Sequence, residues 1–161
     1  MSISFSTGEL VNIAIGIERR GIAFYDIMAK STENVTARGV FQRLADMERE
    51  HIQIFQDMLD EADRYQIPGD TALEYAAYFK ALVDSAVFTD DMVASEMAIN
   101  ADSDVKALEL AISAEKDSIL FYYQMRDVMS KSATPMVDKI LAEEKTHLSQ
   151  LSELKKNLAA I

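Results

Sequence analysis

One stretch of the sequence occurs twice, and this internal repeat restricts the possible folds more than any other feature. The segment "LVNIAIGIERRGIAFYDIM" (10–28) matches "ALELAISAEKDSILFYYQM" (107–125). Ala14, Glu18, Phe24, Tyr25 and Met28 recur 97 positions later as Ala111, Glu115, Phe121, Tyr122 and Met125. The only two histidines repeat as well, because Glu48–His51 recurs as Glu144–His147 at an offset of 96. The pattern indicates two copies of one unit rather than an array of many short repeats.

Each copy has the pattern of two long amphipathic helices. With five glycines and two prolines in 161 residues, little interrupts helix formation. Apolar residues three and four positions apart predict four long helices, over residues 9–30, 35–65, 103–130 and 134–158. Ser6 and Glu9 can form a capping box before the first helix, and Thr134 is the expected N-cap of the last, with Pro135 after it.

The predicted helices form two hairpins joined by a long connection. The first hairpin covers about 8–65, the second covers about 103–159, and the crossover of residues 66–102 begins at the break "QIPGD". One or two shorter helices are expected in this crossover. The predicted fold is all-α, with residues 1–161 forming one domain in which the repeated hairpins pack as a four-helix bundle.

The composition excludes several classes of function. A formal net charge of −11 without clusters of Lys and Arg argues against nucleic-acid binding. The absence of cysteine excludes disulfides and thiolate metal sites. The N-terminal sequence does not resemble a secretion signal, and no apolar run approaches the roughly 18 residues of a membrane span. We therefore expect a soluble, cytoplasmic protein without nucleic-acid or membrane partners.

The glutamates and histidines of the repeat are spaced so that they can meet inside the bundle. Glu18 precedes Glu48 by 30 residues, so in a hairpin that turns near Glu33 both lie about 15 residues, or roughly 22 Å, from the turn. A histidine three residues after a glutamate shares its helix face. Packing of the two hairpins would bring together Glu18, Glu48, His51, Glu115, Glu144 and His147.

Such a cluster predicts a metal site. Four buried carboxylates without compensation would be strongly unfavourable, whereas two divalent cations balance four negative charges. Carboxylate oxygens with one imidazole for each metal suit iron or manganese, and zinc is an alternative.

The motifs that carry this chemistry resemble those of a known family. Glu18 with Tyr25, "EREH" (48–51), "EKDSILFYY" (115–123) and "EEKTH" (143–147) are similar to the rubrerythrin branch of the ferritin-like diiron proteins. The resemblance implies a ferritin-like bundle that binds two iron ions. It also implies that Glu48 and Glu144 bridge the metals, that Glu18 and Glu115 are terminal ligands, and that His51 and His147 each bind one metal.

The sequence departs from rubrerythrins in three respects. It lacks the four cysteines of their rubredoxin module, it has Ser118 where they have an additional glutamate, and it has His147 where they have another glutamate. The symmetric ligand set is closer to that of bacterioferritin. The resemblance implies a non-haem diiron oxidoreductase that reduces peroxide or dioxygen with electrons from an external donor or from Fe(II). The alternatives are a ferroxidase in iron handling and a non-enzymatic metal-binding bundle.

Residues outside the ligand set remain open to two interpretations. Tyr25 and Tyr122 follow Glu18 and Glu115 by two helical turns, so they are either core aromatics or catalytic residues that hydrogen-bond to ligand carboxylates. Tyr123 is a weaker candidate for the same role. We expect Glu50, Glu96 and Glu143 to lie at the surface. Because the crossover is long enough to reach a second subunit, we also expect a homodimer.

Overall fold

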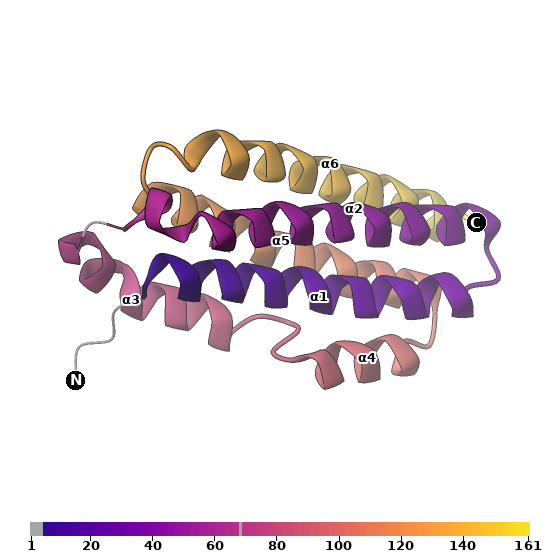
Figure 1. Cartoon of the computed structure of the whole chain (residues 1–161). Coiled ribbons are helices and arrows are strands. Elements are labelled where there is room, and N and C mark those ends of the chain that lie inside the picture. The colour runs from indigo at the N-terminus through magenta and orange to yellow at the C-terminus, as the bar shows by residue number, and fades with distance from the viewer. Residues whose placement is uncertain (1–4, 68) are drawn as a thin grey trace.

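Four long helices form the body of the molecule, in two antiparallel hairpins (Figure 1). The computed structural model describes residues 5–67 and 69–161, except for the side chains of 69–74. The long helices are α1 (Thr7–Ser31), α2 (Val35–Asp60), α5 (Asp104–Val128) and α6 (Thr134–Ala159). Helix α1 packs mainly on α2, and α5 packs mainly on α6. The described ranges contain helices and no strand, which confirms the predicted all-α fold.

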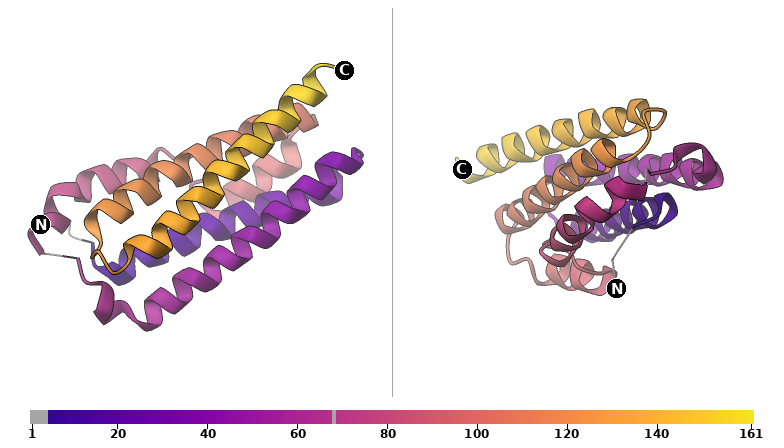
Figure 2. Two further views of the ribbon diagram at one scale, coloured as in Figure 1. Left: turned by 90° about the horizontal axis from the view of Figure 1, so that it is seen from above. Right: turned by 90° about the vertical axis from the view of Figure 1, so that its left-hand side faces the viewer.

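The crossover contains two shorter helices, as the sequence predicts. Helix α3 (Gly69–Asp84) packs on α5, and α4 (Asp91–Asn100) packs on α1. Figure 2 shows both lying along one side of the bundle. Arg19 of α1 pairs with Asp91 of α4 at 2.8 Å. The connection therefore runs along α1 and α5 and covers part of the bundle between them.

Local hydrogen bonds explain most helix ends. The Ser6 side chain accepts a hydrogen bond from the Glu9 backbone at 3.1 Å, and Glu9 accepts one from the Ser6 backbone at 2.6 Å, which confirms the capping box. The predicted helix ends lie within two residues of the observed ones, except for the end of the second helix. Helix α2 ends at Asp60, and a 3-10 helix, η1 (Ala62–Tyr65), follows it.

The predicted N-cap of the last helix is displaced by one residue. Thr134 is the first residue of α6, and Ala133 is its N-cap, without a side-chain cap. The turn before the helix explains the difference, because Ala133 already has α-helical dihedral angles and its N–H bonds to the Ser130 carbonyl at 2.9 Å. The chain is therefore helical before it reaches Thr134.

Buried apolar side chains form two clusters on either side of a polar layer. One cluster includes Phe24, Phe41 and Leu108, and the other includes Phe55 and Phe121. On each of the long helices, the buried glutamates and histidines lie in sequence between the residues of these two clusters. The two apolar cores therefore support the polar layer from both ends of the bundle.

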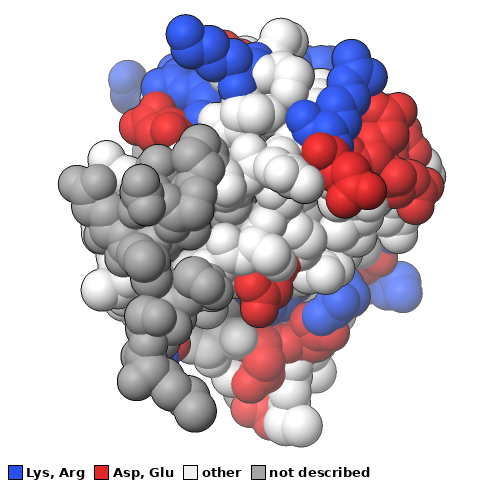
Figure 3. Space-filling model, turned by 60° about the vertical axis from the view of Figure 1, so that its left-hand side comes forward, with Lys and Arg blue, Asp and Glu red and all other residues white. Residues whose placement is uncertain are grey.

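The outer surface carries charges of both signs. On the face in Figure 3, Lys and Arg side chains lie among Asp and Glu around an uncharged central area. In the part of the chain that the structure describes, each helix is too short or too polar to cross a bilayer.

Candidate metal centre

Each long helix contributes to a buried cluster of carboxylates and imidazoles. Helices α1 and α5 each provide one glutamate, and α2 and α6 each provide a glutamate and a histidine one turn later. None of these residues is more than 3% exposed: Glu18, Glu48, His51, Glu115, Glu144 and His147. The structure thus brings together all six residues that the repeat singles out.

The cluster consists of two overlapping sets of possible metal ligands. In each set one atom per residue lies within 4.8 Å of the others: Glu18, Glu48, His51 and Glu144 in the first, and Glu48, Glu115, Glu144 and His147 in the second. Glu48 and Glu144 belong to both sets. This arrangement suits two cations that share two carboxylates, each with one further carboxylate and one imidazole.

Both histidines turn the same ring nitrogen toward the carboxylates. His51 Nδ1 lies 3.0 Å from Glu48 and 3.2 Å from Glu144. His147 Nδ1 lies 3.1 Å from Glu144 and 3.5 Å from Glu48. The two rings stack at a centroid distance of 5.8 Å. Nδ1 is thus the atom that each imidazole can offer to a metal.

Burial and mutual repulsion set the protonation of the cluster. Burial, reinforced by the charge of Glu144, raises the pKa of Glu48 and of Glu115 well above the usual range. Burial alone would also raise the pKa of Glu144, but the nearby imidazoles of His147 and His51 outweigh it, and the pKa is lowered. Burial opposes protonation of both histidines, yet their carboxylate partners raise the pKa of His51 and of His147. These shifts favour the protonated forms of four of the residues and so reduce the negative charge of the metal-free cluster.

The donor set fits a pair of hard divalent cations. Glu144 Oε1 is fully buried and forms no well-aligned hydrogen bond, although His51 Nδ1 lies 3.2 Å away. A buried carboxylate oxygen without a hydrogen-bond donor is unfavourable unless a cation satisfies it. Oxygen-rich ligands with one imidazole for each cation are typical of iron and manganese.

The two buried tyrosines hydrogen-bond to the cluster across the bundle. Tyr25 Oη donates to Glu115 Oε1, and Tyr122 Oη donates to Glu18 Oε1. Each phenol therefore holds a carboxylate of the opposite hairpin, whereas the sequence placed it on the same face as the glutamate of its own helix. Burial raises the pKa of both phenols well above the usual range, so they remain hydrogen-bond donors.

The outer nitrogens of the histidines have contacts that the sequence did not predict. His51 Nε2 lies 2.7 Å from Glu143 Oε2, and His147 Nε2 lies 3.3 Å from Met47 Sδ. The expectation that Glu143 is a surface residue is therefore wrong: its side chain is 28% exposed and turns back toward the neighbouring helix. A signal was present in the sequence, because positions 47 and 143 are equivalent in the repeat.

The remaining candidates lie away from the cluster. Glu50 and Glu96 are exposed, as expected. Tyr123 is half-buried, with Arg126 and Lys145 both 4.9 Å from its ring centroid. It therefore packs against surface cations.

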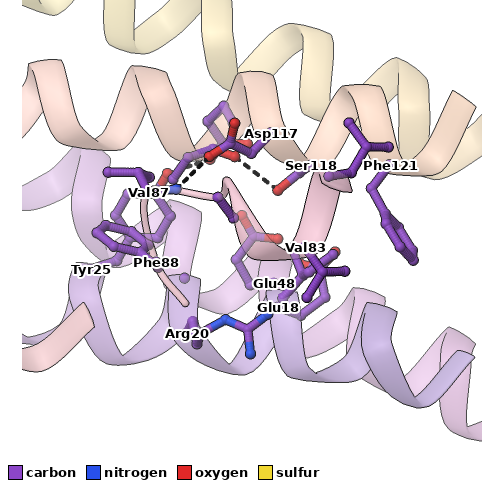
Figure 4. Close-up of a pocket in the computed structure, with 16 residues that line it drawn as sticks. Glu18, Arg20, Tyr25, Glu48, Val83, Val87, Phe88, Asp117, Ser118 and Phe121 are labelled. Atoms are coloured by element: carbon purple, nitrogen blue, oxygen red, sulfur yellow. Dashed lines mark hydrogen bonds between the residues drawn. The ribbon is translucent and has the colours of Figure 1, made fainter. Parts of the chain in front are cut away.

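A cavity of about 40 Å³ reaches the cluster from the side that the crossover covers (Figure 4). Its walls include three of the cluster carboxylates, Glu18, Glu48 and Glu115, together with apolar side chains of the crossover. Ser118 also lines it, and the Ser118 hydroxyl donates to the Ala114 carbonyl at 3.0 Å. The sequence comparison singled out Ser118 but not the crossover residues that enclose the cavity.

The fold and the buried cluster together define a ferritin-like helical bundle with the donor set of a diiron-carboxylate site. The sequence model of the rubrerythrin family matches residues 9–155. The chain belongs to the rubrerythrin family.

A solved structure is similar over nearly the whole length. It is that of a Thermotoga maritima protein, described as ferritin-like and diiron-carboxylate. The two chains are 31% identical, the match covers 95% of this chain and 96% of the other, and the TM-score is 0.73. No curated protein matches the sequence significantly.

Proposed function

We propose that the six clustered side chains bind two iron ions and that the protein is a non-haem diiron oxidoreductase that reduces peroxide or dioxygen. Glu48 and Glu144 would be ligands shared by the two ions, Glu18 and His51 would complete one position, and Glu115 and His147 would complete the other. The two ligand sets that share Glu48 and Glu144 support this assignment, as does family membership.

Two Fe(II) ions held there would supply one electron each; with two protons, these two electrons would reduce hydrogen peroxide to two water molecules, or dioxygen to hydrogen peroxide. The protein fixes the ligands and restricts access. Tyr25 and Tyr122 hold the two terminal carboxylates by hydrogen bonds from the opposite hairpin. Because ligand orientation depends on such outer contacts, these tyrosines are positioning residues.

The observation that carries the proposal is the cavity beside three carboxylates. Its volume of about 40 Å³ has room for about three water molecules, which admits dioxygen or peroxide and excludes a large organic substrate. Apart from the cluster itself, the charged residues that line it are Arg20 and Asp117, and these two charges offset each other. These lining residues do not form an acidic channel that would concentrate Fe(II). Their balanced charge therefore favours a small oxidant as the substrate over a ferroxidase function.

Rapid mixing of the anaerobic Fe(II)-loaded protein with peroxide, and separately with dioxygen, tests the proposal. We expect oxidation of two irons per chain and the near-ultraviolet absorbance of a diferric centre. Ser118→Leu should fill the cavity and slow the reaction at least about tenfold, whereas the matched control Ser118→Ala should leave the rate unchanged.

Two measurements accompany this comparison, the iron stoichiometry and the thermal melting temperature of each variant. They separate a blocked cavity from a damaged fold. A reduced protein that is inert to both oxidants would contradict the proposed function. A Ser118→Leu variant that binds two irons and reacts as fast as the wild type would contradict the assigned route.

A further inference from the structure

The two candidate metal positions differ in one contact just outside the ligand set. At the first position, the outer nitrogen of His51 lies 2.7 Å from a carboxylate oxygen of Glu143. At the second position, the outer nitrogen of His147 lies 3.3 Å from the thioether sulfur of Met47. Both outer partners are half-buried, and both come from the opposite hairpin.

These partners occupy equivalent places in the internal repeat. Position 143 follows position 47 by 96 residues, which is the same offset that relates Glu48 to Glu144 and His51 to His147. The six cluster residues are identical in type in the two copies, and so are Tyr25 and Tyr122. The repeat is thus symmetric in its ligands and in its phenols but not in the residue that contacts the outer imidazole nitrogen.

A carboxylate and a thioether act differently on a neutral imidazole ligand. A carboxylate accepts a strong hydrogen bond from Nε2–H, which fixes the tautomer with the Nδ1 lone pair toward the metal and increases the basicity of that nitrogen. A thioether is a weak acceptor and provides little of either effect. Loss of such an outer partner typically weakens metal binding about 10- to 100-fold.

We infer that the two metal positions are inequivalent, and that Glu143 makes the Glu18–His51 position bind its metal more tightly than the Glu115–His147 position. The inference rests on the proposed metal site and adds an order of filling to it. Glu143 acts through His51 and is therefore a positioning residue. Met47 gives the Glu115–His147 position no comparable support, so its metal affinity is lower. A single equivalent of metal therefore binds at the Glu18–His51 position.

Co²⁺ is a suitable probe, because calorimetry follows its binding and anomalous X-ray scattering locates it. Crystals of the wild-type protein with one equivalent of Co²⁺ should show the ion mainly between Glu18 and His51. Two equivalents should fill both positions. Calorimetry should show two binding steps with different affinities for Co²⁺.

Variants that exchange the outer partners provide matched controls. Glu143→Met should weaken the tighter step about 10- to 100-fold, and Met47→Glu should strengthen the weaker step by a similar factor. The double exchange, Met47→Glu with Glu143→Met, should move the first Co²⁺ to the position between Glu115 and His147. Because all six ligands are retained, each variant should still bind two ions, and thermal melting of the metal-free proteins checks that the variants fold.

The outcomes separate this inference from the proposed function. If Co²⁺ binds with two ions per chain but distributes equally over both positions, or if the double exchange does not move it, the inference is wrong while the metal site stands. If the correctly folded wild-type protein binds no Co²⁺ within the cluster, both the inference and the proposed function are wrong.

Discussion

Glu48 and Glu144 have the same proposed role as shared metal ligands, but their pKa values shift in opposite directions in the metal-free protein. Substitution of each glutamate by glutamine can separate the two effects. The nearby imidazoles of His147 and His51 lower the pKa of Glu144 despite its burial, so we expect this carboxyl to be ionised. Burial and the charges of Glu144 and Glu18 raise the pKa of Glu48 well above the usual range, so we expect this carboxyl to carry a proton in the metal-free protein. We predict that Glu144→Gln and Glu48→Gln affect the stability of the metal-free protein very differently.

The distances in the cluster set the expected size of the difference. Glu144 Oε1 lies 3.2 Å from His51 Nδ1, and Glu144 Oε2 lies 3.1 Å from His147 Nδ1, so one carboxylate serves both buried imidazoles. Removal of one member of a buried ion pair lowers the free energy of unfolding by about 3–5 kcal/mol. In a chain of this size, each kcal/mol changes the melting temperature by about 2–4 °C, which gives a decrease of about 6–20 °C for Glu144→Gln.

Glu48→Gln exchanges one neutral side chain for another of the same shape. Its effect on the metal-free protein should remain within about 1 kcal/mol, because no buried charge loses its partner. With Mn²⁺ at about 100 times its dissociation constant, the wild type should gain about 2.7 kcal/mol for each bound ion. Both variants should lose most of this gain, because each lacks a shared ligand.

Thermal melting followed by circular dichroism, with chelator and then with increasing Mn²⁺, measures both effects on the same samples. The prediction requires a large difference between the two variants without metal and a similar loss of the metal-dependent gain. Equal melting temperatures of the metal-free variants would refute the assigned protonation states. A full Mn²⁺-dependent gain in either variant would refute the shared-ligand role.

Three further predictions follow from the same site. Tyr25→Phe and Tyr122→Phe should each lower the unfolding free energy of the metal-free protein by about 1–3 kcal/mol in denaturant titrations, because a buried glutamate loses its donor; no change in either variant would contradict the crossed hydrogen bonds. Metal binding should release protons and should tighten as the pH rises, because the pKa values of Glu48, Glu115, His51 and His147 are raised in the metal-free fold. Protonation of these groups stabilises the metal-free fold at low pH. This stabilisation decreases as the pH rises, above about 4.5 for the two carboxyls and above about 6.5 for the two histidines. Calorimetry in buffers of different ionisation enthalpy counts the protons, and a count of zero would contradict the assignment. Gly21→Ala should raise the unfolding free energy by about 0.5–1 kcal/mol, because Gly21 lies within α1 and a Cβ there would lie 3.6 Å from Glu48 Cγ, an ordinary contact; a loss of stability would show that the site is tighter than this distance implies.

Helical periodicity and the internal repeat explain why most of the architecture could be predicted from the sequence. Residues three positions apart share a helix face whatever the surroundings, so Glu48 and His51 had to point the same way. Equal distances from the hairpin turn placed Glu18 at their height. The offset between the copies then supplied the second half of the cluster. These arguments need only local geometry and chain connectivity.

The contacts that the sequence missed depend on how the hairpins pack. Glu143 points away from Glu144 on the helical wheel, and only the neighbouring helix α2 brings His51 Nε2 within 2.7 Å of it. The crossed bonds of Tyr25 and Tyr122 likewise depend on the distance between α1 and α5. The cavity depends on where the crossover lies, and the repeat contains no information about that segment.

The cluster also implies that a single hairpin of this sequence would lack partners for its buried polar groups. Glu18 receives its hydrogen bond from Tyr122 of the opposite hairpin, and His51 contacts Glu143 and Glu144, again from that hairpin. A hairpin on its own would bury or expose these groups without the partners that satisfy them, and buried polar groups without partners are strongly unfavourable. The second copy completes the donor and acceptor set of the first, so the duplication and the buried site require each other. Because both copies lie in one chain, the residues that contact the outer histidine nitrogens can differ between the copies while the ligands stay the same. Glu143 and Met47 are the two residues that differ in this way.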